Sequence, residues 1–226
     1  MLTDLSINRN DSPTYAQRAK GKILQHLSAN AREELNKKYQ SEVKVTDFTI
    51  ISSHCAGGTI YHDMGIPFLT PTVNLAIDGD DFCTFCENLE YFLSLELKPY
   101  RTDIVDYPVG RLGGDVEIRF IHYNSFETAK QTWERRKERI NFNKILIMSS
   151  DRDGMGKDKC LKRFDKLPYK KIMYTSKVYP YPWAVHCREF SDRQQVGIMT
   201  ATADLSGRRV YEKYSNIPEL INSLYE

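Results

Sequence analysis

Lys144-Ile-Leu-Ile-Met148 and Lys171-Ile-Met-Tyr-Thr175 are the two stretches that decide the fold of this chain. Each is an apolar run of the length of a buried strand, and residues 157–166 between them have the pattern of a helix. A strand, a helix and a second strand at this spacing predict parallel strands joined by a right-handed crossover. The sequence therefore predicts an α/β fold with a mostly parallel sheet and flanking helices.

The same alternation extends in both directions along the chain. Further strands are predicted at Phe48-Thr-Ile-Ile51, Val73-Asn-Leu-Ala-Ile77, residues 116–122 and Val196-Gly-Ile-Met199. Helices are predicted at residues 82–93 after an acidic cap at Asp78-Gly-Asp-Asp81, at residues 126–140 after Ser125, and at residues 218–225 after Asn216. We expect the strand at residues 116–122 to join the parallel sheet.

Residues 1–226 are expected to form a single α/β unit. Residues 1–39 are predicted to be a helical segment, with Ser12 as its cap and Pro13 at its first position. The polar residues 99–114 separate two α/β segments, residues 40–98 and 115–226. Two arrangements stay open: the segments share one sheet, or they form two Rossmann-like halves that face a cleft.

The composition is that of an ordinary globular protein. Of 226 residues 41% are apolar and 27% are charged, and the formal net charge is +2. So small a charge gives no reason to expect nucleic acid as a partner. The five cysteines, a start without an export signal and the lack of ~18 continuous apolar residues predict reduced thiols, no transmembrane segment and a cytoplasmic protein. The basic face of the first helix leaves peripheral membrane contact open.

Three polar loops follow predicted strands, at residues 52–58, 122–125 and 149–154. In open parallel sheets, ligands bind outside the carboxyl ends of the strands. The first loop, Ser53-His-Cys-Ala-Gly-Gly58, is the most suggestive. Its Ser53, His54, Gly57 and Gly58 are predicted to contact a ligand, since adjacent glycines let a backbone approach a phosphate or carboxylate. A tight turn without a ligand explains the glycines equally well.

Cys55 lies where nucleophiles lie in strand-to-helix turns. A helix start lowers the pKa of a thiol, and a neighbouring histidine would supply a base. A catalytic thiol at Cys55 is therefore one hypothesis. A small buried cysteine without chemistry is the simpler alternative.

Asp151 and Asp153 follow the strand at residues 145–148 with one residue, Arg152, between them. Two carboxylates at a strand end predict a divalent cation that also binds a diphosphate. Asp78-Gly-Asp80 repeats the pattern. Turn formation and helix capping are the alternative for both pairs.

The segment Trp133-Glu-Arg-Arg-Lys-Glu-Arg-Ile-Asn141 is rich in arginine. Arg136 and Arg139 are candidates for binding carboxylate or phosphate, because a guanidinium donates two hydrogen bonds to such groups. A surface of intrahelical ion pairs is the alternative. His122 is the candidate general base, because an imidazole titrates near neutral pH.

Several ordered motifs resemble a bacterial family known as domain of unknown function 1919, whose members often carry the label exopolysaccharide biosynthesis protein. The resemblance covers about residues 45–185. Its motifs here are Cys55, Gly57 and Gly58 with Tyr61, Gly65-Ile-Pro-Phe68, Thr70-Pro-Thr72 with Asn74, Tyr107-Pro-Val-Gly110, His122-Tyr123, and Trp133 with Arg136 and Arg139-Ile-Asn141. The chain departs from the family pattern at Ser53, where asparagine is usual, and at Ala56, where tryptophan is frequent.

The resemblance implies an α/β fold and a genetic association with surface glycans, and it carries over no catalytic residue. Tyr61, Asn74 and Tyr123 join the predicted ligand-binding residues through it. Our first hypothesis is a transferase of surface-polysaccharide assembly that acts on a small-molecule or glycan substrate and uses a nucleotide-sugar or another phosphate-bearing donor. In it, the loop at residues 55–58, Arg136, Arg139 and Arg152 hold the donor.

In the same hypothesis, His122 is the general base. Asp151 is a further catalytic candidate, and a divalent cation, if one is bound, is held by Asp151 and Asp153. A hydrolase or acyltransferase that depends on Cys55 is the second hypothesis. A non-catalytic binding protein of the same pathway is the third.

Overall fold

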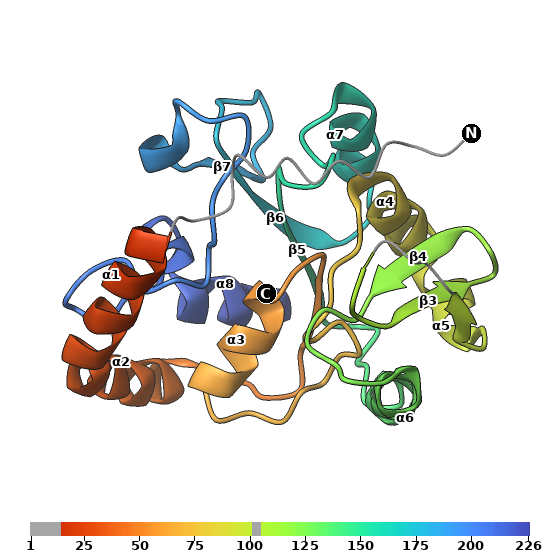
Figure 1. Cartoon of the computed structure of the whole chain (residues 1–226), viewed down its shortest axis with the longest axis horizontal. Helices are drawn as coiled ribbons and strands as arrows, with labels where there is room; N and C mark the ends of the chain where they lie inside the picture. Colours follow the sequence, from red (N-terminus) through yellow and green to blue (C-terminus); the bar gives the residue numbers. More distant parts are fainter. Residues whose placement is uncertain (1–14, 101–104) are drawn as a thin grey trace.

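The computed structural model describes residues 15–100 and 105–226. Within them, the central sheet has four parallel strands in the order β1-β5-β6-β7 (Figure 1). Their bounds are β1 (Thr49–Ser52), β5 (Ile145–Ser150), β6 (Lys170–Thr175) and β7 (Ala184–His186). All residues of β1 and β5 are buried, as expected of parallel strands covered on both faces. Because β1 pairs with β5, the two α/β segments share one sheet.

A second, antiparallel sheet joins three described strands, β2 (Lys98–Tyr100), β3 (Val109–Leu112) and β4 (Val116–Arg119). The prediction that residues 116–122 belong to the parallel sheet is wrong. Gly113 and Gly114 have positive φ angles of +60° and +87°, and the three-residue loop that they begin turns the chain straight back. A parallel pair would need a crossover of a dozen residues or more. The strand also ends at Arg119, before His122.

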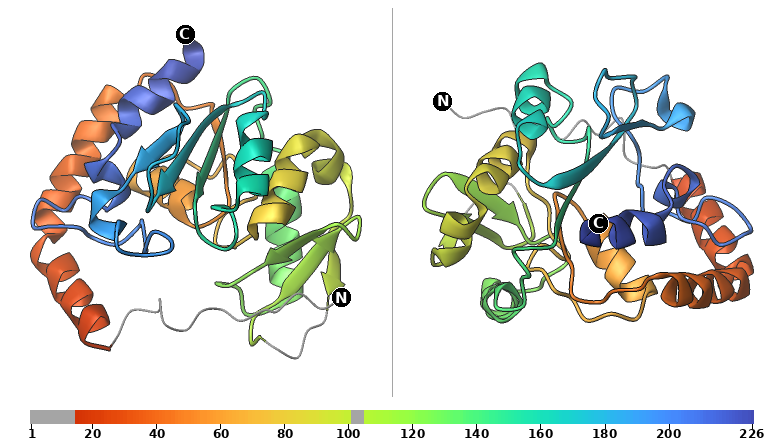
Figure 2. Two further views of the ribbon diagram at one scale, coloured as in Figure 1. Left: turned by 90° about the horizontal axis from the view of Figure 1, so that it is seen from above. Right: turned by 180° about the vertical axis from the view of Figure 1, so that it is seen from behind.

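Helices cover both faces of the central sheet (Figure 2). The α-helices are α1 (Tyr15–Leu27), α2 (Ala29–Glu42), α3 (Ala56–Asp63), α4 (Gly79–Glu87), α5 (Leu89–Ser94), α6 (Phe126–Lys137), α7 (Asp158–Asp165) and α8 (Ile217–Asn222). Short 3-10 helices are η2 (Arg188–Phe190), η3 (Tyr211–Lys213) and η4 (Ser223–Tyr225). Among the described residues, no helix is long and apolar enough to cross a membrane.

Alternate side chains of β1 belong to two different cores. Ile51 packs with residues of α4, α6, α7 and the antiparallel sheet. Ile50 packs with residues of α2, α3 and α8 on the other face. Since successive side chains of a strand point to opposite faces, a four-residue strand is enough to join the two cores. The sheet and its carboxyl edge are thereby held in place from both sides.

Two predicted strands and one predicted helix differ in the structure. The segment Val73-Asn-Leu-Ala-Ile77 forms only a single bridge, between Ala76 and Arg119, because Asn74 has a positive φ angle of 62° that interrupts an extended chain. Residues 196–199 are irregular. The N-terminal helical segment consists of α1 and α2, separated at the buried Ser28. The predicted cap Ser12 and Pro13 lie outside the described residues.

The other caps vary. Ser125 accepts a hydrogen bond from the Thr128 amide, and Asn216 accepts one from the Glu219 amide, so both predicted caps are confirmed. Asp78 occupies the position before α4, but its side chain makes no capping bond. That carboxylate has another partner, described below.

Two buried carboxylates and two partly buried arginines connect α2 and α3 to residues 209–212 near the C-terminal end. We call Arg32, Asp63, Arg209 and Glu212 the interior cluster. Arg209 binds Asp63 through Nε at 2.6 Å and Nη2 at 2.9 Å, and Arg32 bridges Asp63 at 2.9 Å and Glu212 at 2.5 Å. The side chains of Asp63 and Glu212 are 3% and 1% exposed. Burial acts to raise the pKa of Asp63, but the hydrogen bonds and charge of Arg209 lower it.

Candidate functional site

The loops after β1 and β5 meet at the carboxyl edge of the parallel sheet. Ser53 Oγ lies 2.9 Å from Ser149 Oγ, and His54 Nε2 lies 2.8 Å from Asp153 Oδ2. The strands are neighbours in register, so their carboxyl ends bring residues almost 100 positions apart into contact. Two of the three predicted polar loops therefore converge.

An arginine from the antiparallel sheet completes this edge. Arg119, the last residue of β4, binds Asp78 Oδ1 through Nη2, and the same nitrogen lies 3.9 Å from Asp153 Oδ2. We call His54, Asp78, Arg119 and Asp153 the edge cluster. Its two carboxylates share one guanidinium, and their side chains are 42% and 32% exposed. A ligand in solvent can reach both.

The two carboxylates of the edge cluster have opposite pKa shifts. Burial raises the pKa of Asp78 to about 6, and the negative charge of Asp153 adds to this against the charge of Arg119. For Asp153 burial acts in the same direction, but the hydrogen bond and charge of His54, with Arg119, outweigh it and lower the pKa to about 2. When the pKa values of two neighbouring carboxyl groups differ in this way, one group can act as an acid and the other as a base.

His54 is held from both ring nitrogens. Nδ1 lies 2.8 Å from Ser53 Oγ, and Nε2 contacts Asp153. Ser53 is fully buried and its hydroxyl also contacts Ser149, so it is not placed to attack a substrate. His54 therefore positions Asp153, and a proton acceptor for a ligand has to be sought at Asp78.

The backbone beside Asp78 is in close contact with the turn after Asp153. Asp153 and Gly154 have positive φ angles of 50° and 87°. The Gly79 amide donates to the Asp153 carbonyl at 2.9 Å. A Cβ on Gly79 would lie 2.5 Å from the Met155 nitrogen, so no other residue fits without movement. This contact fixes Asp78 against the turn at residues 153–157.

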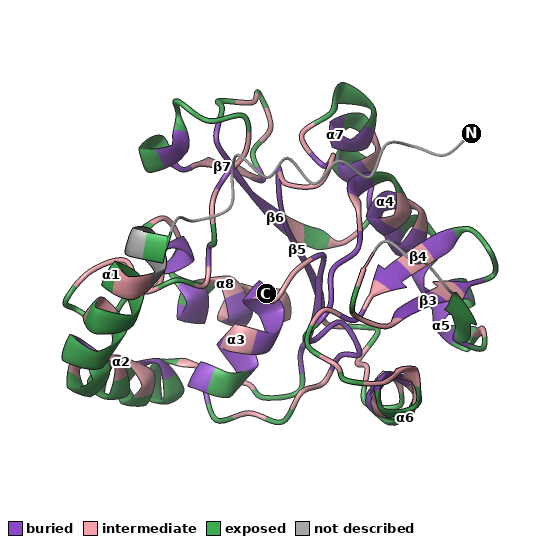
Figure 3. Cartoon of the chain, in the orientation of Figure 1, coloured by how far each residue is buried: buried purple, intermediate pink, exposed green. Residues whose placement is uncertain are grey.

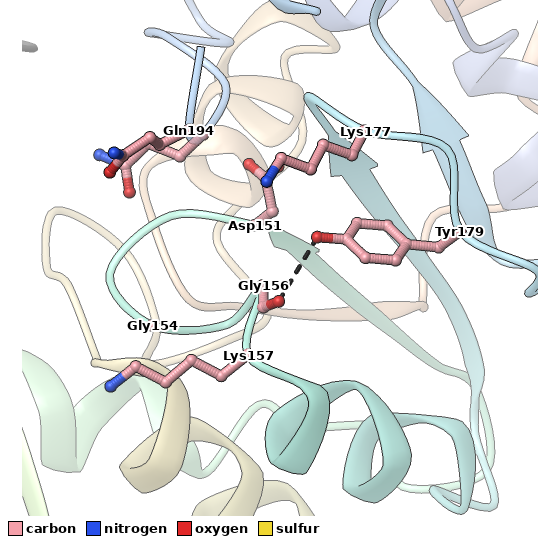
Figure 4. A pocket seen from close by; sticks show the side chains of 8 residues that line it. Asp151, Gly154, Gly156, Lys157, Lys177, Tyr179 and Gln194 are labelled. Atoms are coloured by element: carbon pink, nitrogen blue, oxygen red, sulfur yellow. Dashed lines mark hydrogen bonds between the residues drawn. The ribbon is translucent and has the colours of Figure 1, made fainter.

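A pocket of about 360 Å³ opens on the same turn (Figure 4). We call it the lysine pocket. Its lining residues are Asp151, Gly154, Gly156, Lys157, Lys177, Tyr179, Gln194 and Gln195. Lys157 comes from the turn before α7, whereas Lys177 and Tyr179 come from the segment after β6 (Figure 4). Neither lysine forms an ion pair with any residue in the described ranges.

The one acid among the lining residues, Asp151, binds protein donors and not the two lysines. Asp151 is 4% exposed, and its Oδ2 accepts hydrogen bonds from the Ser176 amide at 2.6 Å and hydroxyl at 2.7 Å. Its Oδ1 accepts from the Val196 amide at 2.8 Å. The carboxylate of Asp151 thus joins the loops after β5, β6 and η2. Asp153 is directed to His54 and Arg119 instead.

The prediction of a shared cation at Asp151 and Asp153 does not fit this geometry, because the two carboxylates are bound to different groups. Within residues 15–100 and 105–226, no three His, Cys, Asp or Glu side chains gather in an arrangement for a metal ion. The catalytic role of Asp151 stays a prediction, and in the structure both of its oxygens accept hydrogen bonds from protein donors.

A second pocket, of about 320 Å³, contains Cys55, Gly58 and Asn74 of the predicted site residues. Burial raises the pKa of the Cys55 thiol, although the charge of Arg152 acts against it. The sequence predicts the opposite shift from the start of α3. The short helix does not compensate for burial, so Cys55 lacks the thiolate character of a nucleophile.

The paired glycines serve helix packing. A Cβ on Gly57 would lie 2.9 Å from Ile50 Cγ2, and a Cβ on Gly58 would lie 2.8 Å from Val73 Cγ1. Both glycines let α3 lie close to β1 and its neighbouring segment. Tyr61 is also structural: it is fully buried, donates to the Phe48 carbonyl and accepts from the Ile50 amide. The structure therefore gives these residues packing contacts, and a ligand contact stays a prediction for Gly58, which lines the second pocket.

The third predicted loop, residues 122–125, makes its contacts with other residues than those of the edge cluster. His122 is exposed, whereas the Tyr123 hydroxyl accepts a hydrogen bond from Arg136 at 3.1 Å. Arg136 is 8% exposed and its guanidinium covers the Phe68 ring at 4.5 Å. Arg139 Nη1 donates to the Phe68 carbonyl at 3.5 Å. The arginine-rich helix α6 therefore holds the Phe68 segment through protein contacts.

Arg152 is closer to the predicted site. Its Nη1 lies 3.5 Å from the Gly197 carbonyl, and its charge acts on Cys55. Its buried Nε has no hydrogen-bond partner among the residues that the structure describes.

Three residues of the candidate site were missed in the sequence. Arg119 lies in a strand whose pairing was wrongly predicted, and no motif marks Lys157 or Lys177. The position of Lys177 just after the predicted strand at residues 171–175 is the one signal that was available.

Comparison with known proteins identifies the family of this chain and one relative. The sequence matches the family described as Domain of unknown function (DUF1919) over residues 26–221. This chain belongs to that family. It is also 33% identical over 198 residues to an uncharacterized protein of Haemophilus influenzae, a match that covers 87% of this chain and 95% of that protein. The DUF1919 match includes β1, β5 and β6, and both loops that form the edge cluster.

Proposed function

We propose that this DUF1919 protein is an enzyme that acts on a phosphate-bearing sugar in the assembly of surface glycans. The lysine pocket binds the phosphate groups. A hydroxyl of the acceptor attacks the sugar carbon that carries the phosphate while Asp78 accepts its proton, and the bond from that carbon to the phosphate oxygen breaks, so that the phosphate leaves with the bonding electrons and stays at the lysines. The observation that supports the proposal is the contact of Gly79 with the turn at residues 153–157, because this turn also lines the lysine pocket and Asp78 directly precedes Gly79.

Charge supports the nature of the ligand. Lys157 and Lys177 are two ammonium groups on different loops, and Asp151 is the one acid among the lining residues, so the lining carries an excess of one formal positive charge. Lysine binds phosphate as a flexible point charge, so the pocket favours an anion over a neutral sugar. Its volume of about 360 Å³ is within the ordinary range for small-ligand sites.

Proton transfer supports the type of chemistry. A group with a pKa of about 6 is mostly deprotonated at pH 7 and still takes up a proton readily. Asp78 Oδ1 binds Arg119, and among the described residues none hydrogen-bonds its Oδ2. The positive charge of Arg119 and the negative charge of Asp153 lie next to Asp78 and act on its pKa in opposite directions. Asp78 thus takes the role that the sequence analysis gave to His122.

Calorimetric titration with nucleotide diphosphate sugars and sugar phosphates, with and without Mg²⁺, tests the proposal. We expect saturable binding, and we expect Lys157→Ala and Lys177→Ala each to weaken it about tenfold or more, as for other hydrogen bonds to charged groups. Lys159→Ala is the matched control, because Lys159 is in α7, two residues after Lys157, but its side chain is 72% exposed and bound to Asp80. Wild-type protein that binds none of these compounds would refute the proposal.

A second variant separates an enzyme from a binding protein. Asp78→Asn should bind the donor as wild type does and abolish its consumption, which is followed by chromatography of the nucleotide product. Unchanged consumption would remove Asp78 from the mechanism.

A further inference from the structure

Helix α1 carries an apolar stripe that no described part of the chain covers. Tyr15, Ile23 and Leu27 are 89%, 61% and 68% exposed. They lie at intervals of eight and four residues, hence on one side of the helix. Helix α1 lies at the outer margin of the molecule, and Figure 3 shows most of it exposed (Figures 1 and 3).

Positive charge borders this stripe on both sides. Each residue advances about 100° around a helix, so Lys20 and Lys22 lie on opposite flanks of the stripe. Both are exposed, as is His26 in the last turn. The sequence of α1, YAQRAKGKILQHL, contains three Arg or Lys residues and no acid, whereas α2 contains three of each sign. The excess of positive charge is therefore specific to α1.

We infer that α1 docks on an anionic lipid surface, with Ile23 and Leu27 among the acyl chains and Lys20 and Lys22 at the headgroups. An apolar face bordered by lysines is the pattern of helices that lie in the membrane interface. Anionic headgroups complement the charge, and each lysine near such a surface adds attraction. A second copy of the chain is a poorer partner, because an identical stripe would bring its own lysines against these.

The contact is distinct from the proposed enzyme site. Residues 26–221 match the family, so most of α1 precedes the matched region. Membrane docking would hold the protein at a lipid surface without taking part in the chemical step.

Flotation of the full chain with vesicles tests the inference. We expect binding to phosphatidylcholine vesicles that contain phosphatidylglycerol and little binding to pure phosphatidylcholine. Ile23→Glu with Leu27→Glu should lower the partition coefficient at least about tenfold, because two large apolar side chains no longer enter the bilayer. Val178→Glu, at a side chain 77% exposed outside α1, should bind as wild type does.

Three results would overturn the inference: no flotation with anionic vesicles, equal flotation with both kinds of vesicle, or equal losses in the α1 and Val178 variants. Sedimentation equilibrium of the wild type and the α1 variant completes the test. A dimer that the α1 substitutions abolish would assign the stripe to a second copy of the chain instead. Unchanged circular dichroism and melting temperature would show that the variant is folded.

Discussion

The interior cluster and the edge cluster are built from the same kinds of side chain, but they differ in enclosure. In the interior cluster every carboxylate is nearly inaccessible and bound to arginine. In the edge cluster, both carboxylates are partly exposed and share one guanidinium. The first arrangement leaves no capacity for a ligand. The second does, and this difference distinguishes a structural ion network from a candidate site.

The largest expected effect tests the structural role of the interior cluster. Arg209→Ala should lower the free energy of unfolding by about 3 kcal/mol, because it leaves Asp63 buried with fewer partners. Arg208→Ala is the control, since its side chain is 48% exposed and its ion pair with Asp204 is a surface one. Urea denaturation at pH 7 measures both. A loss at Arg209 no larger than the loss at Arg208 would mean that the interior cluster does not stabilise the fold.

An acid titration should resolve the contribution of the edge cluster. The pKa of Asp153 is lowered to about 2 in the folded protein, so its stabilising effect is present above its unfolded value near 4 and is lost as pH falls from about 4 to 2. The loss should be about 2 kcal/mol. Unfolding measured over this pH range should therefore be less pH-dependent in Asp153→Asn than in wild type. Identical pH profiles would contradict the shift.

The smallest effect is expected at Asp78, where the sign is reversed. Its folded pKa is raised to about 6, so the wild type loses stability relative to Asp78→Asn as pH rises from about 4 to 6. Because the side chain is 42% exposed, solvent screening should limit the difference to about 1 kcal/mol or less. Melting of both proteins at pH 4, 5, 6 and 7 measures it. A variant that becomes less stable than wild type across this range would show that Asp78 is mainly a structural ion-pair partner.

The sequence predicted where the edge cluster would be and marked His54, Asp78 and Asp153, but it did not indicate Arg119 or the partner of each carboxylate. Parallel strands bring their carboxyl ends together, so the meeting of Ser53-His54 with the loop after β5 followed from strand pattern alone. Asp151 and Asp153 are the same residue type two positions apart, and spacing cannot show that one is buried against backbone amides. Partners from distant segments, Ser176 and Val196, decide that.

The other errors have two physical origins. The apolar pattern of residues 116–122 fits parallel and antiparallel strands alike, and the glycines after β3 decided between them. With that pairing wrong, Arg119 was not expected beside Asp78. The glycines Gly57 and Gly58 were assigned to a ligand because their contacts with Ile50 and Val73 depend on how closely α3 approaches the sheet. Tertiary packing of this kind leaves no local signal.

Amide chemical shifts of the full chain during titration with a nucleotide diphosphate sugar test the central claim most directly. The account predicts saturable shifts at Gly79 and residues 153–157, with the amides of Asp63 and Glu212 unchanged. Saturable shifts that centre on the interior cluster, or an absence of shifts at residues 153–157 at millimolar ligand, would contradict it.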